Sequence, residues 1–428
     1  MKSKASAKAG RVMELDEASR EAWPRGVSAD AGSGKTHELM ESLAALLRRR
    51  GEEERQASKR LHVDQVACIT FTRNAAGELW SRAYLRLRQE QARAEAEGRD
   101  AAYWADQIAR LPGAAFCTLH SLANLIVQQA PLEAGGGARN EFLDEEASKE
   151  LMAQAADREM NLLDREGGLA RLLFRFGIRS SAFQKGLPGL LADFAFRALA
   201  DGLSRDDLHA KAKDSFRPCD DGDGPSEAEW NEFGRVFMDA IAGTMDRYAK
   251  LRGQRLDFAE ALVLARNLLR DRHFRERILD RFRFVFLDEA QDTDPVQLEV
   301  LFWLSGATAE DAPFGDRLVM VGDDKQAIYR WRSAEPRLFR QALDQFKERG
   351  ALYELRANWR ALPRLAAAYQ ALGDMCRDPH SLASGKPPAP DPSPCRRLLE
   401  PAEVAPVVEQ MRRGPAILRL KSEAYALE

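Results

Sequence analysis

The pattern of apolar and polar residues divides the chain into parts of different character. Apolar runs of strand length lie at 66–71, 284–287 and 318–321, and polar residues follow each of them. A helix is expected to begin near Asn74, after the first run. Another amphipathic helix is predicted after residue 36 from the spacing of Leu39, Leu43, Leu46 and Leu47. Short apolar strands that alternate with helices predict a parallel sheet, and therefore an α/β fold.

The stretch from about 131 to 255 has helical periodicity instead. It opens with three glycines at 135–137 and has a polar break at 220–225, which we interpret as a solvated loop. One helical face is predicted from Leu151, Ala155, Met160, Leu162 and Leu163. Strand-like runs resume after this stretch. We therefore interpret it as a helical domain inserted between two halves of the α/β core, 1–130 and 256–345.

Composition and charge exclude several classes of protein. With 45 % hydrophobic and 31 % charged residues, the 428-residue chain is too apolar for a disordered protein. No apolar run approaches the ~18 residues of a membrane-spanning helix, and the amino terminus lacks the apolar core of a secretory signal. The five cysteines lie far apart without a CxxC pair, which argues against a zinc or iron–sulfur site and favours a reducing cytoplasm. A formal net charge of −3 does not indicate a nucleic-acid partner, but it is compatible with a local basic groove.

A glycine-rich segment precedes the first predicted helix. Residues 29–36 read Ala-Asp-Ala-Gly-Ser-Gly-Lys-Thr, which is typical of a phosphate-binding loop at a helix amino terminus, although a simple helix-capping turn is the alternative. Lys35 would reach the β- and γ-phosphates, and Thr36 would hold Mg²⁺. Ala29 replaces the glycine of the strict pattern, and the strand before it is poor, with Val27 as its one large apolar residue. The candidate nucleotide-binding residues are Ala29, Ala31, Gly32, Ser33, Gly34, Lys35 and Thr36.

An acidic pair follows the apolar run at 284–287. Asp288 would complete the coordination of Mg²⁺, and Glu289 would orient or deprotonate an attacking water. Alone, the pair could equally be an acidic surface loop. Together with the phosphate loop it favours metal-assisted phosphoryl transfer, because that chemistry needs both parts.

At this point the chain resembles superfamily 1 helicases of the UvrD/Rep type, including the RecB and AddA branch. The segments that carry the resemblance are in the family's order over roughly residues 15–362. Besides the two phosphate motifs they are Thr-Phe-Thr-Arg-Asn-Ala-Ala at 70–76, Thr-Leu-His-Ser at 118–121, Leu-Asp-Phe at 256–258, Val-Gly-Asp-Asp-Lys-Gln-Ala-Ile-Tyr-Arg-Trp-Arg at 321–332 and Leu-Arg-Ala-Asn-Trp-Arg at 355–360.

The resemblance implies a RecA-like P-loop NTPase fold and a role for each matched residue. Gln326 would sense the γ-phosphate, Trp359 would stack on adenine, and Arg360 would contact the γ-phosphate. Phe71 and Trp331 would stack on bases of a single strand, which suits a motor that accepts any sequence. Contacts to the DNA backbone would come from Thr72, Arg73, Thr118 and His120.

The chain also departs from the family's pattern. Ser19 stands where relatives place an adenine-reading glutamine, and Asp30 puts a carboxylate inside the phosphate loop. No match to the family's last two motifs is found after Arg360, so residues 346–428 are expected to form only part of a second RecA-like domain. The sequence is therefore interpreted as the N-terminal motor portion of such a helicase, either as a truncated gene product or as a fragment.

The function expected from the resemblance is that of a 3′-to-5′ translocase or helicase in DNA repair or recombination. It would use ATP and Mg²⁺, act on single-stranded or tailed duplex DNA, and work at the nucleoid in the cytoplasm, without a membrane. The alternative is an ATP- and single-strand-binding module that a partner chain completes. A small-molecule kinase is a third interpretation, but it leaves Phe71 and Trp331 unexplained.

Overall fold

The structure is a computed structural model. It describes residues 13–14, 24–29, 32–130, 142–166, 186–215, 226–310, 312–327 and 335–355. Within these ranges seven strands form one sheet in the order β1-β7-β2-β6-β5-β3-β4, and every neighbouring pair is parallel. The strands are β1 (Met13–Glu14), β2 (Arg25–Ala29), β3 (Val66–Thr70), β4 (Ala115–Thr118), β5 (Phe284–Leu287), β6 (Leu318–Gly322) and β7 (Leu352–Leu355). The predicted α/β fold is confirmed.

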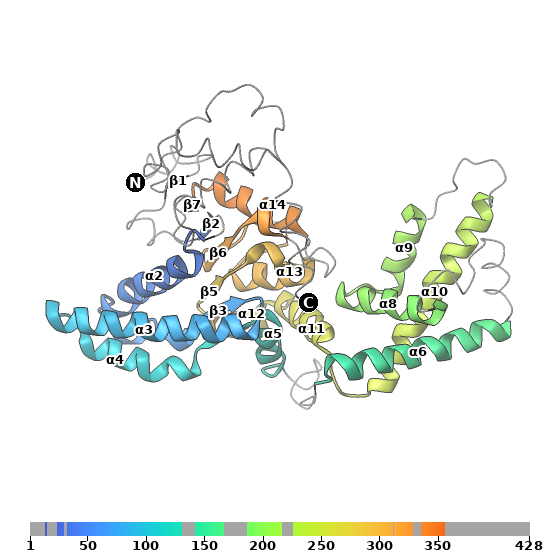
Figure 1. The fold of residues 1–428 in the computed structure, drawn as a ribbon, viewed down its shortest axis with the longest axis horizontal. Helices are drawn as coiled ribbons and strands as arrows, with labels where there is room; N and C mark the ends of the chain where they lie inside the picture. Colours follow the sequence, from blue (N-terminus) through green and yellow to red (C-terminus); the bar gives the residue numbers. More distant parts are fainter. Residues whose placement is uncertain are drawn as a thin grey trace, which may run out of the picture.

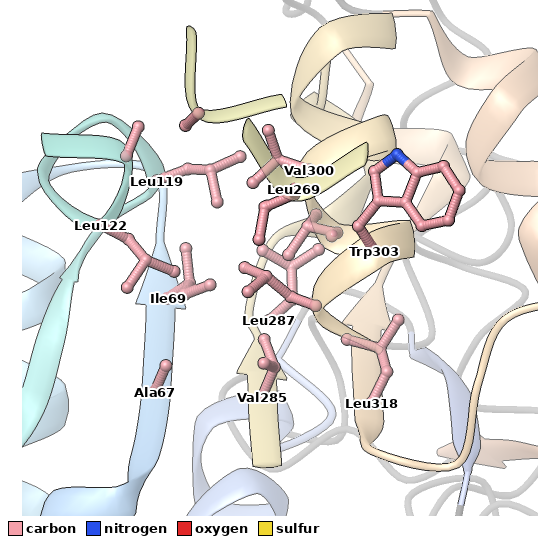
Figure 2. Close-up of a cluster of buried hydrophobic side chains, with 14 of the residues drawn as sticks. Ala67, Ile69, Leu119, Leu122, Leu269, Val285, Leu287, Val300, Trp303 and Leu318 are labelled. Carbon is pink, nitrogen blue, oxygen red and sulfur yellow. The ribbon is translucent and has the colours of Figure 1, made fainter. Parts of the chain in front are cut away.

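Helices cover both faces of this sheet (Figure 1). The helices around it are α2 (Lys35–Leu47), α3 (Arg73–Glu97), α4 (Ala101–Arg110), α5 (Leu119–Val127), α11 (Phe258–Arg270), α12 (Arg272–Arg281), α13 (Pro295–Leu304) and α14 (Pro336–Glu348). Side chains alternate along each strand, so Phe286 packs with α2, α3 and α4, whereas Val285 and Leu287 pack with the other helices. Figure 2 shows part of this second cluster, where Val300 and Trp303 of α13 meet the strands.

The strand before the phosphate loop is longer and more central than its sequence suggests. Arg25, at its start, is fully buried; it donates to the Ser42 hydroxyl on α2 and forms an ion pair with Glu38 of the same helix. Gly26 is required by packing, because a Cβ there would lie 2.7 Å from Cδ2 of Phe346. Because Arg25 and Gly26 begin this strand, its sequence does not form a continuous apolar run.

A separate group of helices lies to one side of the sheet (Figure 1). It consists of α6 (Glu145–Glu166), α8 (Gly186–Ala200), α9 (Arg205–Ser215) and α10 (Glu227–Arg252), which share their own buried cluster. The two segments that join it to the sheet run side by side, because Phe142 pairs with Leu256 and the Leu143 amide donates to the Leu256 carbonyl at 2.9 Å. The described part of 131–255 is mainly helical, as predicted. The boundaries of the inserted domain stay a prediction.

One predicted member of the apolar face of α6 is placed differently. Leu162 is 40 % exposed, whereas Ala155 is fully buried. The buried face passes through Glu159, which pairs with Arg247 of α10, and continues to Leu163. One residue is about 100° of rotation around a helix, so Leu162 is turned away from that face.

The end of the described chain also differs from expectation. Residues 346–428 were expected to belong to a second core, but β7 pairs with β2 through Leu352 to Leu355 and completes the first sheet. Leu352 and Tyr353 are buried there. Residues 352–355 therefore belong to the first core, and residues 356–428 lie outside the described ranges.

Candidate nucleotide-binding and strand-binding site

Within the described ranges, five of the segments that the sequence singled out lie at the carboxyl ends of strands. The phosphate loop follows β2, Phe71 follows β3, Thr118 ends β4, Asp288 follows β5, and Asp323 follows β6. Because the strands are parallel, these segments meet at one edge of the sheet, which is where open α/β sheets bind ligands. β6 lies between β2 and β5, so its loop is flanked by the phosphate loop and the acidic pair.

The described part of the phosphate loop has the backbone that its glycines permit. Gly32 and Gly34 have φ values of 74° and 90°, in the left-handed region that favours glycine. Gly34 is the residue before the first turn of α2, which begins at Lys35. Within the described chain the buried Ser33 hydroxyl has no hydrogen-bond partner. A buried donor at a helix amino terminus fits an anionic ligand such as a phosphate group.

Both predicted acidic residues reach the phosphate loop. The Thr36 hydroxyl donates to Oδ2 of Asp288 at 3.3 Å, and Nζ of Lys35 lies 2.8 Å from Oε2 of Glu289. Asp288 is 6 % exposed, and Lys35 is also buried. Residues that are far apart in sequence thus place a hydroxyl and a carboxylate together, a donor set that suits Mg²⁺ held mainly by phosphates and water.

The electrostatics of the acidic pair favour binding of a cation. Burial raises the pKa of Asp288 to about 6, with a further contribution from the neighbouring Glu289 carboxylate and against the effect of Lys35. The Glu289 amide donates to Oδ1 of Asp288 at 2.9 Å. Glu289 has a φ of 52°, which is uncommon for a residue with a side chain. A bound cation would favour ionised Asp288 and remove the cost of its burial.

Sequence reasoning missed Gln291 and Asp323, which connect the acidic pair to the loop after β6. Gln291 is 2 % exposed and lies in the short helical turn η8 (Ala290–Asp292). Its amide contacts Glu289 on one side and the Asp323 backbone on the other. Gln326, in η9 (Asp324–Gln326), donates to Oδ2 of Asp323 at 2.6 Å. The one signal in the sequence was proximity, since Gln291 lies two residues after Glu289.

The residues predicted to contact DNA have local structural partners. Oγ1 of Thr72 accepts from the Ala75 amide at 3.1 Å and caps α3. Oγ1 of Thr118 caps α5 in the same way, through the Ser121 amide at 3.3 Å. Arg73 is exposed beside the first cap. These threonines are therefore helix caps, and their role toward DNA stays a prediction.

His120 and Phe71 lie at the same edge of the sheet. The His120 ring packs edge-on against Phe258 with centroids 6.1 Å apart, and Phe258 stacks on Phe142. Burial lowers the pKa of His120, which therefore favours the neutral ring at neutral pH. Phe71 is partly exposed.

Other predicted site residues lie outside the described ranges. They are Ser19, Asp30, Ala31, Trp331, Trp359 and Arg360. In the part of the chain that is described, no helix is long and apolar enough to cross a membrane. That same part contains no cluster of three or more His, Cys, Asp or Glu side chains suited to a metal ion.

Comparison with known proteins shows the family to which the chain is similar. Residues 16–347 match the family model of the UvrD/REP helicase N-terminal domain. The chain is 25 % identical over 324 residues to DNA helicase II of Haemophilus influenzae, covering 75 % of this chain and 34 % of that protein. It is 26 % identical over 364 residues to the ATP-dependent DNA helicase Rep of Escherichia coli, covering 83 % and 41 %. To the ATP-dependent DNA helicase UvrD2 of Mycobacterium tuberculosis it is 26 % identical over an alignment of 439 residues, covering 94 % and 50 %. The chain thus spans half or less of the length of these relatives.

Proposed function

The chain belongs to the UvrD/REP helicase N-terminal domain family, and from that premise we propose that it is the nucleotide-binding motor portion of an ATP-dependent DNA helicase. The observation that carries the proposal is the meeting of Lys35 and Thr36 with the acidic pair at one edge of the sheet. Phosphoryl transfer needs a phosphate cradle, a metal-binding oxygen set and a carboxylate that positions water, and these three parts adjoin here.

The residues present fit ATP and Mg²⁺. The buried, unpartnered Ser33 hydroxyl and the helix amino terminus at Lys35 suit the phosphates, and Thr36 with Asp288 suits the metal. When bound, Mg²⁺·ATP supplies the phosphoanhydride whose hydrolysis drives the motor. Trp359 would stack on its adenine, as the family resemblance implies.

Lys35 and Glu289 change partners in this proposal. They form an ion pair with Nζ and Oε2 2.8 Å apart. With nucleotide bound, Lys35 would hold the β- and γ-phosphates, and the Glu289 carboxylate would then be free to orient the attacking water and accept its proton. Gln326 and Arg360 would contact the γ-phosphate, where donors stabilise the transferred charge.

The strand-binding surface is proposed beside this site, at the ends of β3 and β4. Phe71 and Trp331 would stack on bases, and Arg73, Thr72, Thr118 and His120 would contact the backbone of single-stranded DNA. The finer expectations belong to this proposal too: 3′-to-5′ movement on single-stranded or tailed duplex DNA, a role in repair or recombination at the nucleoid, and an inserted helical domain at 131–255.

ATP hydrolysis by the purified chain tests the proposal. We expect oligo(dT) to raise the rate, and Glu289→Gln to lower it by about 10²–10⁴-fold while nucleotide binding persists. Glu276→Gln, on an exposed helix face, is the matched control and should leave the rate unchanged. Binding without stimulated turnover would favour the alternative, an ATP- and strand-binding module completed by a partner chain. If the parent binds no nucleotide, and Lys35→Ala behaves identically, both functions are refuted.

A further inference from the structure

Gln291 joins two loops of the site through the two ends of one side-chain amide. Its Nε2 donates to Oε2 of Glu289 at 2.8 Å, and its Oε1 accepts from the Asp323 amide at 2.9 Å. A carboxylate on one side requires a donor, and a backbone N–H on the other requires an acceptor. Among uncharged side chains, only the carboxamides of Asn and Gln offer an N–H donor and a carbonyl acceptor on one rigid plane.

The connection continues on both sides of Gln291. Oε2 of Glu289, which receives the amide, is the oxygen that lies 2.8 Å from Nζ of Lys35. Oδ2 of Asp323 accepts from Nε2 of Gln326 at 2.6 Å. A continuous series of polar contacts thus runs from the phosphate loop to the loop after β6.

The end of β6 is built to allow this contact. A Cβ added at Gly322 would lie 2.8 Å from Oε1 of Gln291 and 2.7 Å from Cζ of Phe339. Both distances are shorter than a side chain tolerates. Gly322 therefore lets the backbone of β6 approach the amide closely enough for hydrogen bonding.

Gln107 shows what a purely structural buried glutamine looks like in this chain. It is fully buried, accepts from the Val63 amide at 2.9 Å and donates to the Tyr103 carbonyl at 3.1 Å. Val63 lies just before β3, at the opposite edge of the sheet from the site. Gln107 thus makes the same kinds of bond without touching any candidate site residue.

We propose that Gln291 is a positioning residue that transmits the state of Glu289 to the loop after β6. When Lys35 leaves Glu289 for a phosphate, the carboxylate shifts, the Gln291 amide follows, and Asp323 and Gln326 move with it. This inference rests on the proposed function for its trigger, nucleotide binding. The contacts themselves exist without nucleotide.

Hydrogen exchange of the full chain, followed by mass spectrometry, tests the contacts first without nucleotide. Gln291→Leu removes both ends of the link, so amides in 322–327 should exchange about two- to tenfold faster, as expected for one lost hydrogen bond. Gln291→Glu keeps an oxygen for the Asp323 amide but sets a second carboxylate against Glu289, so it too should speed this exchange. Gln107→Leu, the matched control, should affect its own surroundings only. Unchanged exchange at 322–327 in Gln291→Leu would overturn the proposal.

The same measurement with Mg²⁺·ATPγS tests transmission. In the parent, nucleotide should protect the peptide that contains Gly32 to Thr36 and change exchange at 322–327 together. In Gln291→Leu and Gln291→Glu the phosphate loop should still be protected, while the response at 322–327 is lost. An undiminished response in both variants would refute transmission through Gln291. Absence of protection at the phosphate loop in the parent would instead refute the proposed function, and the nucleotide-free result would still decide whether Gln291 holds the loop.

Discussion

Tyr248 links the helical group to the helix α11 beside the sheet. Removal of its hydroxyl tests the contribution of one hydrogen bond to this connection. Tyr248 is fully buried near the end of α10, and its hydroxyl donates to Oδ2 of Asp257 at 2.6 Å. The other oxygen of Asp257 accepts from the Glu260 amide at 2.7 Å and caps α11. Burial raises the pKa of Tyr248, so the phenol remains a donor throughout the usual pH range.

Tyr248→Phe removes one hydrogen bond and leaves a buried carboxyl oxygen unpaired. Asp257 is 3 % exposed, so water cannot easily replace the lost donor. A hydrogen bond to a carboxylate contributes about 1.5–3 kcal/mol, compared with about 0.5–1.5 kcal/mol for a neutral pair. We therefore expect the variant to lose about 1.5–3 kcal/mol of unfolding free energy.

Urea unfolding followed by circular dichroism measures this loss, and Tyr103→Phe provides the matched control. The Tyr103 hydroxyl is also buried, but it donates to a neutral carbonyl, that of Leu61, at 2.7 Å. The control should lose about 0.5–1.5 kcal/mol. If Tyr248→Phe costs no more than Tyr103→Phe, the reasoning that a buried carboxylate depends on this hydroxyl is refuted.

Three further results are expected. Gly26→Ala should destabilise the chain by about 1–3 kcal/mol in urea unfolding, because its Cβ meets Phe346; an unchanged midpoint would contradict the close packing of β2. Burial, and next the Asp257 carboxylate, raises the pKa of Glu260 from 4.5 to about 7. Between these two pH values folded Glu260 holds a proton that the unfolded chain has released, so the unfolding free energy falls as the pH rises from 4.5 to about 7. The slope is at most about 1.4 kcal/mol per pH unit, and Glu260→Gln should flatten it; identical pH profiles would exclude this titration. Arg73→Gln should weaken oligo(dT) binding and reduce its log–log salt slope by about 0.7; an unchanged slope would remove Arg73 from the strand-binding surface.

Strands with continuous apolar runs were predictable, and so was the helix after the phosphate loop. The runs at 66–71, 284–287 and 318–321 became β3, β5 and β6 with only end residues changed. Their sequences report burial directly, because central strands of a parallel sheet are covered on both faces. β2 is equally central but begins with Arg25, whose burial depends on partners on α2 that no local pattern reveals.

The candidate site was predictable where chemistry constrains the residue type. Lys35, Thr36, Asp288 and Glu289 were identified from the sequence, and the structure brings all four together. Gln291 was not identified, because the role proposed for it arises from a contact with the backbone of the loop after β6, which lies beside it only in the fold. A hydrogen bond between residues that are 32 positions apart produces no periodic pattern of apolar and polar residues in the sequence.

The order of strands in the sheet determines when the nucleotide site can form during synthesis. The phosphate-loop strand β2 has β6 and β7 as its two neighbours, so both edges of β2 stay unpaired until residues 318–355 have left the ribosome. The helical group is made earlier and closes over its own cluster without the sheet. Until then a nascent chain carries an unpaired strand, a state that favours aggregation and invites chaperones. The phosphate-loop strand thus gains its two neighbours one after the other, first β6 and then β7.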